Sequence, residues 1–183
     1  MGVKHLLSYL TNNGLLETIV HTPDTPSLDG VVIDGLAFGY HLLEQIPSIP
    51  VAGGEYAAFA RASDAFFKNL KDMEVPCVVI IDGCSGAEKI PTQVARESAR
   101  VDYYHQALNA SRVGDPPGAM APIMMKQALA QTLLENGIEF WVSDEEADAA
   151  IAHEANDRGW LVLSNDSDFV IFESPGESRP PTF

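Results

Sequence analysis

Four short runs of apolar, mainly β-branched residues constrain the fold of this 183-residue chain more than any other feature. The runs are continuous rather than alternating, which is typical of strands buried on both faces of a parallel sheet. The first two runs end at Asp-Gly pairs, which favour a turn. The four predicted strands are residues 31–33, 75–81, 138–142 and 160–163, and residues 169–172 are a candidate fifth strand.

Helical patterns lie between these runs. Within one of them Met125, Leu129 and Leu133 are four residues apart, and Asn136-Gly137 follows as a typical helix end. Strands that alternate with helices predict an α/β fold, with a mostly parallel central sheet flanked by helices. The predicted helices are residues 36–46, 55–73, 94–110, 121–135 and 145–157.

The composition is that of an ordinary globular domain, with 46% hydrophobic and 20% charged residues, so wholesale disorder is excluded. No apolar run approaches the roughly 20 residues that span a bilayer, and the first residues do not form a secretory signal. The two cysteines, Cys77 and Cys84, are expected to be free thiols in a reducing compartment. These features predict an intracellular protein of the nucleus or cytoplasm that does not enter a membrane.

Carboxylates follow each of the four predicted strands. Asp34 and Asp82 end the first two, acids at 144–148 follow the third, and Asp166 and Asp168 follow the fourth. The C-terminal ends of parallel strands meet at one edge of a sheet, so these acids should lie together. A carboxylate cluster cannot stay fully ionised without cations, and oxygen ligands suit Mg²⁺, Mn²⁺ or Ca²⁺. Two such ions roughly 3.5–4 Å apart form the clamp used in phosphodiester cleavage.

Each acid also has a purely structural interpretation. Asp34 could cap the helix that follows it, and Asp82 could belong to an Asp-Gly turn. The segment from Ser143 to Glu146 matches a capping box, and the acids at 166–168 could form Asx turns. Capping does not require an acid at the end of all four strands, so metal binding is favoured for the set as a whole.

Five motifs occur in an order that resembles one protein family. They are Met1-Gly2-Val3, Val32-Ile33-Asp34-Gly35, Ile80-Ile81-Asp82-Gly83, Glu146-Ala147-Asp148-Ala149 and Ser164-Asn165-Asp166-Ser167-Asp168. In this order they resemble the flap endonuclease/XPG-like (PIN-like) superfamily of structure-specific nucleases, over nearly the whole chain. Residues 143–172 and 111–114 make the chain most similar to the Asteroid-like branch. The resemblance implies a nuclease domain of PIN-like or 5′-3′ exonuclease type.

The resemblance also implies a ligand set and a cofactor. In the family, matching acids hold two divalent ions, Mg²⁺ or Mn²⁺. Asp148 stands where flap endonucleases more usually have Glu, which keeps a ligand but shortens its reach. The matching residues are Asp34, Asp82, Glu146, Asp148, Asp166 and Asp168.

Other residues match positions that contact the substrate. Lys89 and Arg96 match the family's basic pair, which steers and polarises the scissile phosphate. Tyr40 matches an aromatic residue that stacks on a substrate base, and Gly2 matches the N-terminus that threads near the active site. The alternatives are that Lys89 and Arg96 are solvated helix charges and that Tyr40 belongs to the core.

The net charge of −15 argues against a nucleic-acid partner only if the charges are evenly spread. They are not, because eight of the eleven Lys and Arg residues lie within residues 61–126. Arg96 and Arg100 fall on the same predicted helix as Tyr103 and Tyr104. Cationic and aromatic groups together hold single strands without reading sequence, so Arg100 is a further substrate-binding candidate.

We interpret residues 1–172 as one nuclease domain, in which residues 83–118 form a gateway or arch-like segment. Residues 173–183 are interpreted as a loop or tail. The family carries a later metal-binding Asp and a helical module that grips duplex DNA, and this chain ends at Phe183 before either. We therefore expect the chain to be a truncated piece of a longer protein.

The favoured function is a two-metal, structure-specific endonuclease that hydrolyses phosphodiester bonds in branched, flap or overhang DNA. Its partner would be DNA with a junction between single and double strands. The alternative is a catalytically inactive pseudo-nuclease that serves as a nucleic-acid- or protein-binding scaffold. A haloacid-dehalogenase-like phosphatase is excluded, because its second Asp, two residues after the first, is Leu36 here.

Overall fold

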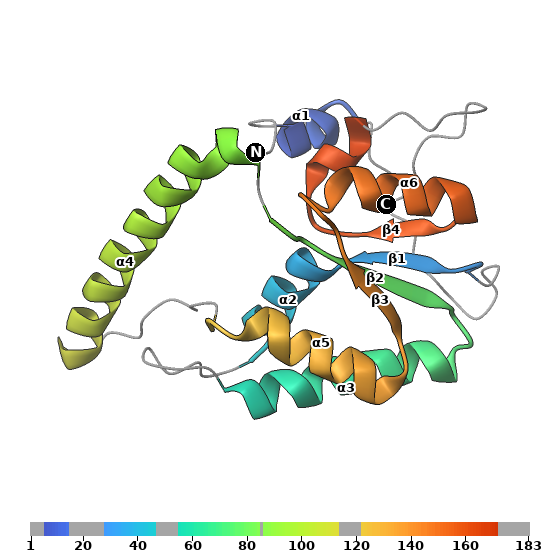
Figure 1. The fold of residues 1–183 in the computed structure, drawn as a ribbon, viewed down its shortest axis with the longest axis horizontal. Helices are drawn as coiled ribbons and strands as arrows, with labels where there is room; N and C mark the ends of the chain where they lie inside the picture. The colour runs from blue at the N-terminus through green and yellow to red at the C-terminus, as the bar shows by residue number, and fades with distance from the viewer. Residues whose placement is uncertain (1–5, 15–27, 47–54, 85, 114–121, 172–183) are drawn as a thin grey trace.

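A four-stranded, all-parallel sheet forms the centre of the protein, with strand order β3-β2-β1-β4 (Figure 1). The structure is a computed structural model that describes residues 6–14, 28–46, 55–84, 86–113 and 122–171. The predicted α/β fold with a parallel sheet is confirmed. The strands are β1 (Val31–Asp34), β2 (Cys77–Ile81), β3 (Glu139–Val142) and β4 (Leu161–Leu163).

Helices connect the strands, most of them close to the predicted positions. They are α1 (Leu6–Asn12), α2 (Gly35–Glu44), α3 (Tyr56–Asp72), α4 (Ile90–Val113), α5 (Met125–Asn136) and α6 (Asp148–Arg158), with short 3-10 helices η1 (Ala87–Lys89) and η2 (Ser167–Ile171). Helix α1 was not predicted. Helix α4 starts earlier than predicted because Pro91 lies in its first turn, where a missing N–H costs nothing. The predicted helix end at Gly137 is confirmed, since this residue has φ 61° and caps α5.

The candidate fifth strand at residues 169–172 is wrong. The described part of that segment, up to residue 171, belongs to η2. The N–H of Asp168 donates to Asp166 Oδ1 at 3.0 Å, which starts a turn directly after β4. Phe169 is then buried against α6 and the sheet. The turn is enough to bury the ring of Phe169, and an extended strand is not needed.

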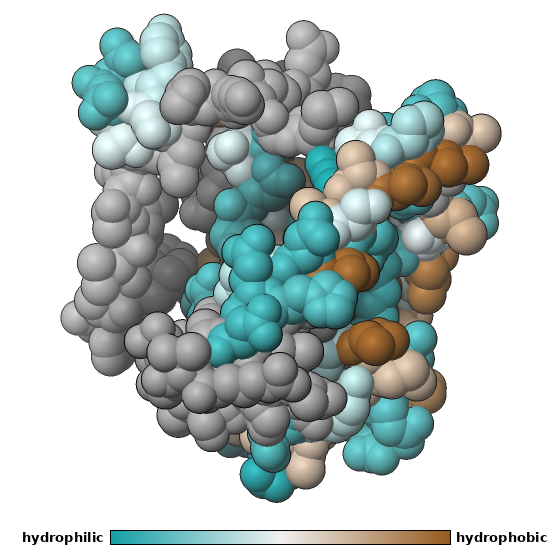
Figure 2. Space-filling view, turned by 90° about the vertical axis from the view of Figure 1, so that its left-hand side faces the viewer, coloured by the Kyte–Doolittle hydropathy of each residue, from teal (hydrophilic) through white to brown (hydrophobic). Residues whose placement is uncertain are grey.

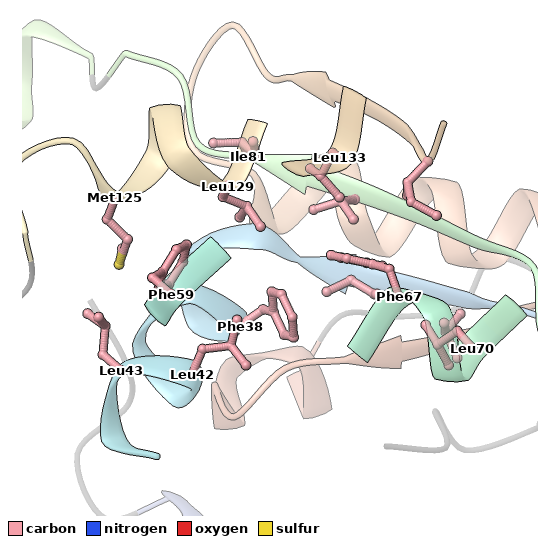
Figure 3. Close-up of a cluster of buried hydrophobic side chains, with 14 residues drawn as sticks. Phe38, Leu42, Leu43, Phe59, Phe67, Leu70, Ile81, Met125, Leu129 and Leu133 are labelled. Carbon is pink, nitrogen blue, oxygen red and sulfur yellow. The ribbon is translucent and has the colours of Figure 1, made fainter. Parts of the chain in front are cut away.

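The two faces of the sheet carry separate hydrophobic cores. Val31 and Ile33 point toward α2, α3 and α5, where Phe38, Phe59 and Phe67 pack (Figure 3). The residue between them, Val32, points to the other face and packs with α6 and η2 residues. This alternation makes a three-layer arrangement in which helices cover both faces of the sheet (Figure 1).

Burial on both faces holds for the central strands only. Every residue of β1 is buried, as is β2 from Val78 to Ile81, whereas β3 and β4 lie at the two edges of the sheet and stay partly exposed. Their apolar runs predicted the strands correctly but not their edge positions. Cys77 and Cys84 are free thiols, as predicted.

Helix α4 extends away from the sheet (Figure 1). Its apolar residues Ile90, Val94 and Val101 are half exposed. None of the helices in the described ranges is long and apolar enough to cross a membrane. The predicted loops at 47–54 and 114–118 and the tail at 173–183 lie outside the described residues.

Candidate active site

Asp34 lies at the C-terminal end of β1 and is almost completely buried. Its Oδ1 accepts hydrogen bonds from the N–H groups of Leu36 and Ala37, both at 3.0 Å, so it caps α2 as the structural alternative proposed. Its Oδ2 accepts a hydrogen bond from the hydroxyl of Ser164, at 2.9 Å. Burial raises the pKa of Asp34, the three hydrogen bonds oppose this, and the charge of Asp82 raises it further.

Asp82 directly follows β2, next to β1 in the sheet. Its Oδ1 accepts a hydrogen bond from the N–H of Ala147 at 2.8 Å, so the end of β2 is joined to the start of α6. The ammonium group of Lys126 on α5 donates to the backbone carbonyl of Asp82 at 3.0 Å. Asp82 is therefore held by elements on both faces of the sheet.

The loop that carries Glu146 packs closely on the loop that follows Asp82. The N–H of Gly83 donates to the carbonyl of Glu145 at 3.0 Å. A Cβ atom at Gly83 would lie only 1.7 Å from the backbone oxygen of Ser143, so only glycine fits there. The capping box expected at Ser143 is not formed, because α6 begins at Asp148 and its cap residue makes no side-chain hydrogen bond.

Glu146 and Asp148 fall at the junction between this loop and α6. Asp148 is the first residue of the helix. Burial is the largest cause that raises the pKa of Asp148 to about 6, followed by the charges of Asp166, Asp82, Asp34 and Glu146. These five acids therefore share one electrostatic neighbourhood at the edge where all four strands end.

Asp166 and Asp168 follow β4. Asp166 Oδ1 accepts from the N–H of Asp168, which is the Asx turn considered above, and the N–H of Asp166 donates to Ser164 Oγ at 3.1 Å. Ser164 thus connects Asp34 to Asp166. Asp168 lies in the first turn of η2.

Two basic residues flank the acids. Lys89 forms an ion pair with Glu146, and both side chains are about two-fifths exposed. This hydrogen bond is the main cause that lowers the pKa of Glu146, and the charge of Arg96 lowers it further. The positive charges of Lys89 and Arg96 therefore both act on Glu146.

Of the other predicted substrate residues, the structure describes the side chain of Tyr40 only. Tyr40 lies on α2 and is 38% exposed, so it does not belong to the buried core. The side chain of Arg100 and the whole of Gly2 lie outside the described residues. Figure 2 looks onto the side of the molecule where the strands end, and hydrophilic side chains fill the middle of the coloured surface.

The donor set fits a hard cation, although the side chains are not arranged around one. Across the described segments, no three His, Cys, Asp or Glu side chains converge closely enough to hold a metal ion. The acids offer oxygen ligands only, which is the chemistry that Mg²⁺ and Mn²⁺ prefer. Hydrogen bonds and Lys89 compensate part of their charge, and the charges of neighbouring acids add to the rise that burial causes in the pKa of Asp148.

Sequence reasoning missed three residues that organise this site. Ser143 and Ser164 directly follow β3 and β4, and a small polar residue at a strand end was the available signal. Lys126 has no such signal, because it contacts a backbone carbonyl 44 residues away in the sequence.

Comparisons with known proteins find relatives of this chain in sequence and in fold. No family model matches the chain. The human protein named single-strand DNA endonuclease ASTE1 is 30% identical over 175 residues, which are 94% of this chain and 25% of that protein. Its namesake from Danio rerio is also 30% identical, and protein asteroid of Drosophila melanogaster is 26% identical over 172 residues, 93% of this chain and 19% of that protein. The chain therefore spans about a quarter of the length of the curated relatives it matches.

Two solved structures of the catalytic core of Rad2 in complex with DNA substrate have the same fold. One has a TM-score of 0.54 and 15% identity and covers 81% of this chain and 42% of that chain. The other has a TM-score of 0.55 and 13% identity and covers 88% and 44%.

The fold defines the class as an α/β domain like the catalytic core of Rad2. The predicted resemblance to the flap endonuclease/XPG-like superfamily is confirmed. The sequence similarity is to Asteroid-like proteins.

Proposed function

We propose that this chain is the nuclease domain of a metal-dependent, structure-specific DNA endonuclease. The observation that carries the proposal is the gathering of five carboxylates from the ends of four parallel strands, with the pKa of Asp148 raised to about 6. Such a perturbed cluster is typical of a functional site. The names of the relatives and the DNA-bound state of the Rad2 structures support a DNA nuclease.

The acids would hold two Mg²⁺ or Mn²⁺ ions. When bound, such ions activate the attacking water and neutralise charge on the phosphodiester. Asp34 and Asp82 are fixed by hydrogen bonds to backbone groups, which limits their motion on binding. Glu146 would exchange its partner Lys89 for an ion. The full proposed ligand set is Asp34, Asp82, Glu146, Asp148, Asp166 and Asp168.

Lys89 and Arg96 would bind the scissile phosphate. Once released from Glu146, the ammonium group of Lys89 can donate up to three hydrogen bonds to phosphate oxygens. The guanidinium of Arg96 can bind a phosphate in a bidentate manner. Cations fixed at this position stabilise the negative charge that develops in the transition state.

The other contacts and the domain limits complete the proposal. Gly2, Tyr40 and Arg100 would bind the substrate strand, and the segment 83–118, which contains α4, would act as the gateway around it. Residues 1–172 would form the nuclease domain. The substrate would be DNA with a junction between single and double strands.

A catalytically inactive scaffold is the second candidate. It is favoured by one observation, that the acid side chains in the described ranges are not arranged around a metal ion. The same domain would then bind nucleic acid or a protein without cleaving it.

Cleavage of labelled flap, overhang and single-stranded DNA in Mg²⁺ or Mn²⁺ tests the proposal. Asp82→Ala and Asp166→Ala should abolish metal-dependent cleavage by the protein. The matched control is Asp157→Ala, which removes an exposed acid whose ion pair with His153 lies near the other end of α6. The nuclease proposal is contradicted if no metal-dependent cleavage occurs, or if both variants cleave like the wild type. DNA binding without cleavage supports the scaffold.

A further inference from the structure

The hydroxyl of Ser143 lies between the two loops that carry the acids. Ser143 directly follows β3 and is 7% exposed. Its Oγ accepts a hydrogen bond from the N–H of Gly83 at 3.2 Å and donates to the carbonyl of Glu145. The Ser143 hydroxyl is therefore bonded to the backbone of both loops, the one after β2 and the one after β3.

Backbone hydrogen bonds surround this hydroxyl and leave little freedom. The N–H of Ser143 donates to the carbonyl of Ile81 at 3.0 Å, and the N–H of Cys84 donates to the carbonyl of Asp144 at 3.3 Å. Gly83 approaches the backbone of Ser143 so closely that no side chain fits between them. The loop after β2 and the loop after β3 therefore form one packed unit.

This unit sets the spacing between acids from different strands. Asp82 directly precedes Gly83, and Glu146 directly follows Glu145. The N–H of Ala147 also donates to Asp82 Oδ1, which adds a second connection between the two loops. Any shift of one loop against the other would move Asp82 relative to Glu146 and Asp148.

We infer that Ser143 is a positioning residue, whose hydroxyl fixes the distance between Asp82 and the Glu146–Asp148 pair. The inference rests on the proposed function, because that distance matters only if the acids share metal ions. Within the described residues the hydroxyl of Ser143 makes hydrogen bonds to backbone groups only, so it acts on the acids through Gly83 and Glu145. Groups that orient metal ligands typically change metal affinity or activity about 10- to 100-fold when removed.

A buried serine elsewhere in the fold provides the matched control. Ser63 on α3 is completely buried, and its hydroxyl has no hydrogen-bond partner among the residues the structure describes. Ser63→Ala makes the same chemical change as Ser143→Ala, away from the two loops. Ser143→Thr keeps the hydroxyl and is the conservative variant.

The first measurement uses metal-free protein. Amide hydrogen–deuterium exchange at residues 82–84 and 143–147 should become faster in Ser143→Ala, should return toward the wild-type rate in Ser143→Thr, and should not change in Ser63→Ala. Unchanged exchange in Ser143→Ala would overturn the inference, since the hydroxyl would then not hold the loops together.

The second measurement is the affinity for Mn²⁺ alone, read from the electron paramagnetic resonance signal of the free ion. We expect Ser143→Ala to bind Mn²⁺ about 10-fold more weakly and Ser143→Thr to recover most of the affinity. A change below twofold, or an equal loss in Ser63→Ala, overturns the inference and leaves the proposed function intact. Wild-type protein that binds no Mn²⁺ overturns both.

Discussion

Lys89 and Glu146, 57 residues apart in the sequence, form an ion pair at the edge of the acid cluster. The pair joins the end of η1 to the loop before α6. It raises the pKa of Lys89 and lowers that of Glu146, so both groups are charged at neutral pH. In the metal-free protein Lys89 supplies part of the positive charge that the acids require.

The first prediction concerns Lys89→Met. Loss of the ammonium group removes a competitor for Glu146, so the affinity for Mn²⁺ should rise severalfold. Cleavage should nevertheless fall by about 10²- to 10³-fold, which is typical when one group that stabilises the transition state is removed. Titration with Mn²⁺ and single-turnover cleavage measure the two effects separately.

Lys68→Met is the control for this prediction, because Lys68 pairs with Asp64 at 2.7 Å on the surface of α3. Lys68→Met should change neither the affinity for Mn²⁺ nor the rate of cleavage. A Lys89→Met variant that loses Mn²⁺ affinity in parallel with cleavage would show that Lys89 supports the metal ions and does not compete with them.

The second prediction concerns pH and Asp148. Its pKa is raised from 3.8 to about 6 in the folded protein, so the folded state binds more protons than the unfolded state between these values. Stability in EDTA should therefore fall as pH rises through about 4 to 6. Asp148→Asn should remove this dependence and raise the Tm at pH 7.5 by a few degrees, about 1 kcal/mol after screening by solvent.

In Mg²⁺ the wild type should have a higher Tm than Asp148→Asn, since the ion stabilises only the protein that keeps the carboxylate. Thermal melts in EDTA and in Mg²⁺ test both statements, with Asp157→Asn as an exposed-acid control. A lower Tm for Asp148→Asn in EDTA at pH 7.5 would refute the account of uncompensated charge.

The third prediction concerns Gly83→Ala. The new Cβ would meet the backbone oxygen of Ser143 at 1.7 Å, and a backbone atom cannot rotate away as a side chain can. The two loops must separate, which should lower the free energy of unfolding by about 2–3 kcal/mol and weaken Mn²⁺ binding. Urea denaturation and Mn²⁺ titration measure these changes.

Gly39→Ala is the matched control, because its Cβ would meet only the flexible end of the Met125 side chain, at 3.1 Å. Its stability should stay within about 1 kcal/mol of the wild type, since alanine favours the helix interior. Equal stability of Gly83→Ala and Gly39→Ala would contradict the described contact between the loops.

The sequence predicted much of this site because chain order and sheet geometry act together. Asp34 and Asp82 each follow an apolar run, and parallel strands bring their ends to one edge. The predicted helix at 145–157 contained both Glu146 and Asp148, whereas α6 begins at Asp148 and leaves Glu146 in the loop before it.

Other features depend on contacts that local patterns do not encode. The pairing of Lys89 with Glu146 and the bond from Lys126 to the Asp82 carbonyl arise only when separate elements pack. No capping box forms at Ser143 because α6 begins only at Asp148, and the Ser143 hydroxyl instead accepts a hydrogen bond from the N–H of Gly83, 60 residues away. The short run at 169–172 carried no signal that separates a strand from a 3-10 turn.

Diffraction from a crystal of the protein soaked in Mn²⁺ would show whether the acids hold metal ions. We expect anomalous density from two ions between Asp34, Asp82, Glu146 and Asp166, with Glu146 turned away from Lys89. Crystals of Asp82→Ala should lose at least one of the two peaks. Absence of anomalous density among these acids in the wild-type crystal, at a Mn²⁺ concentration that supports cleavage, would contradict the account.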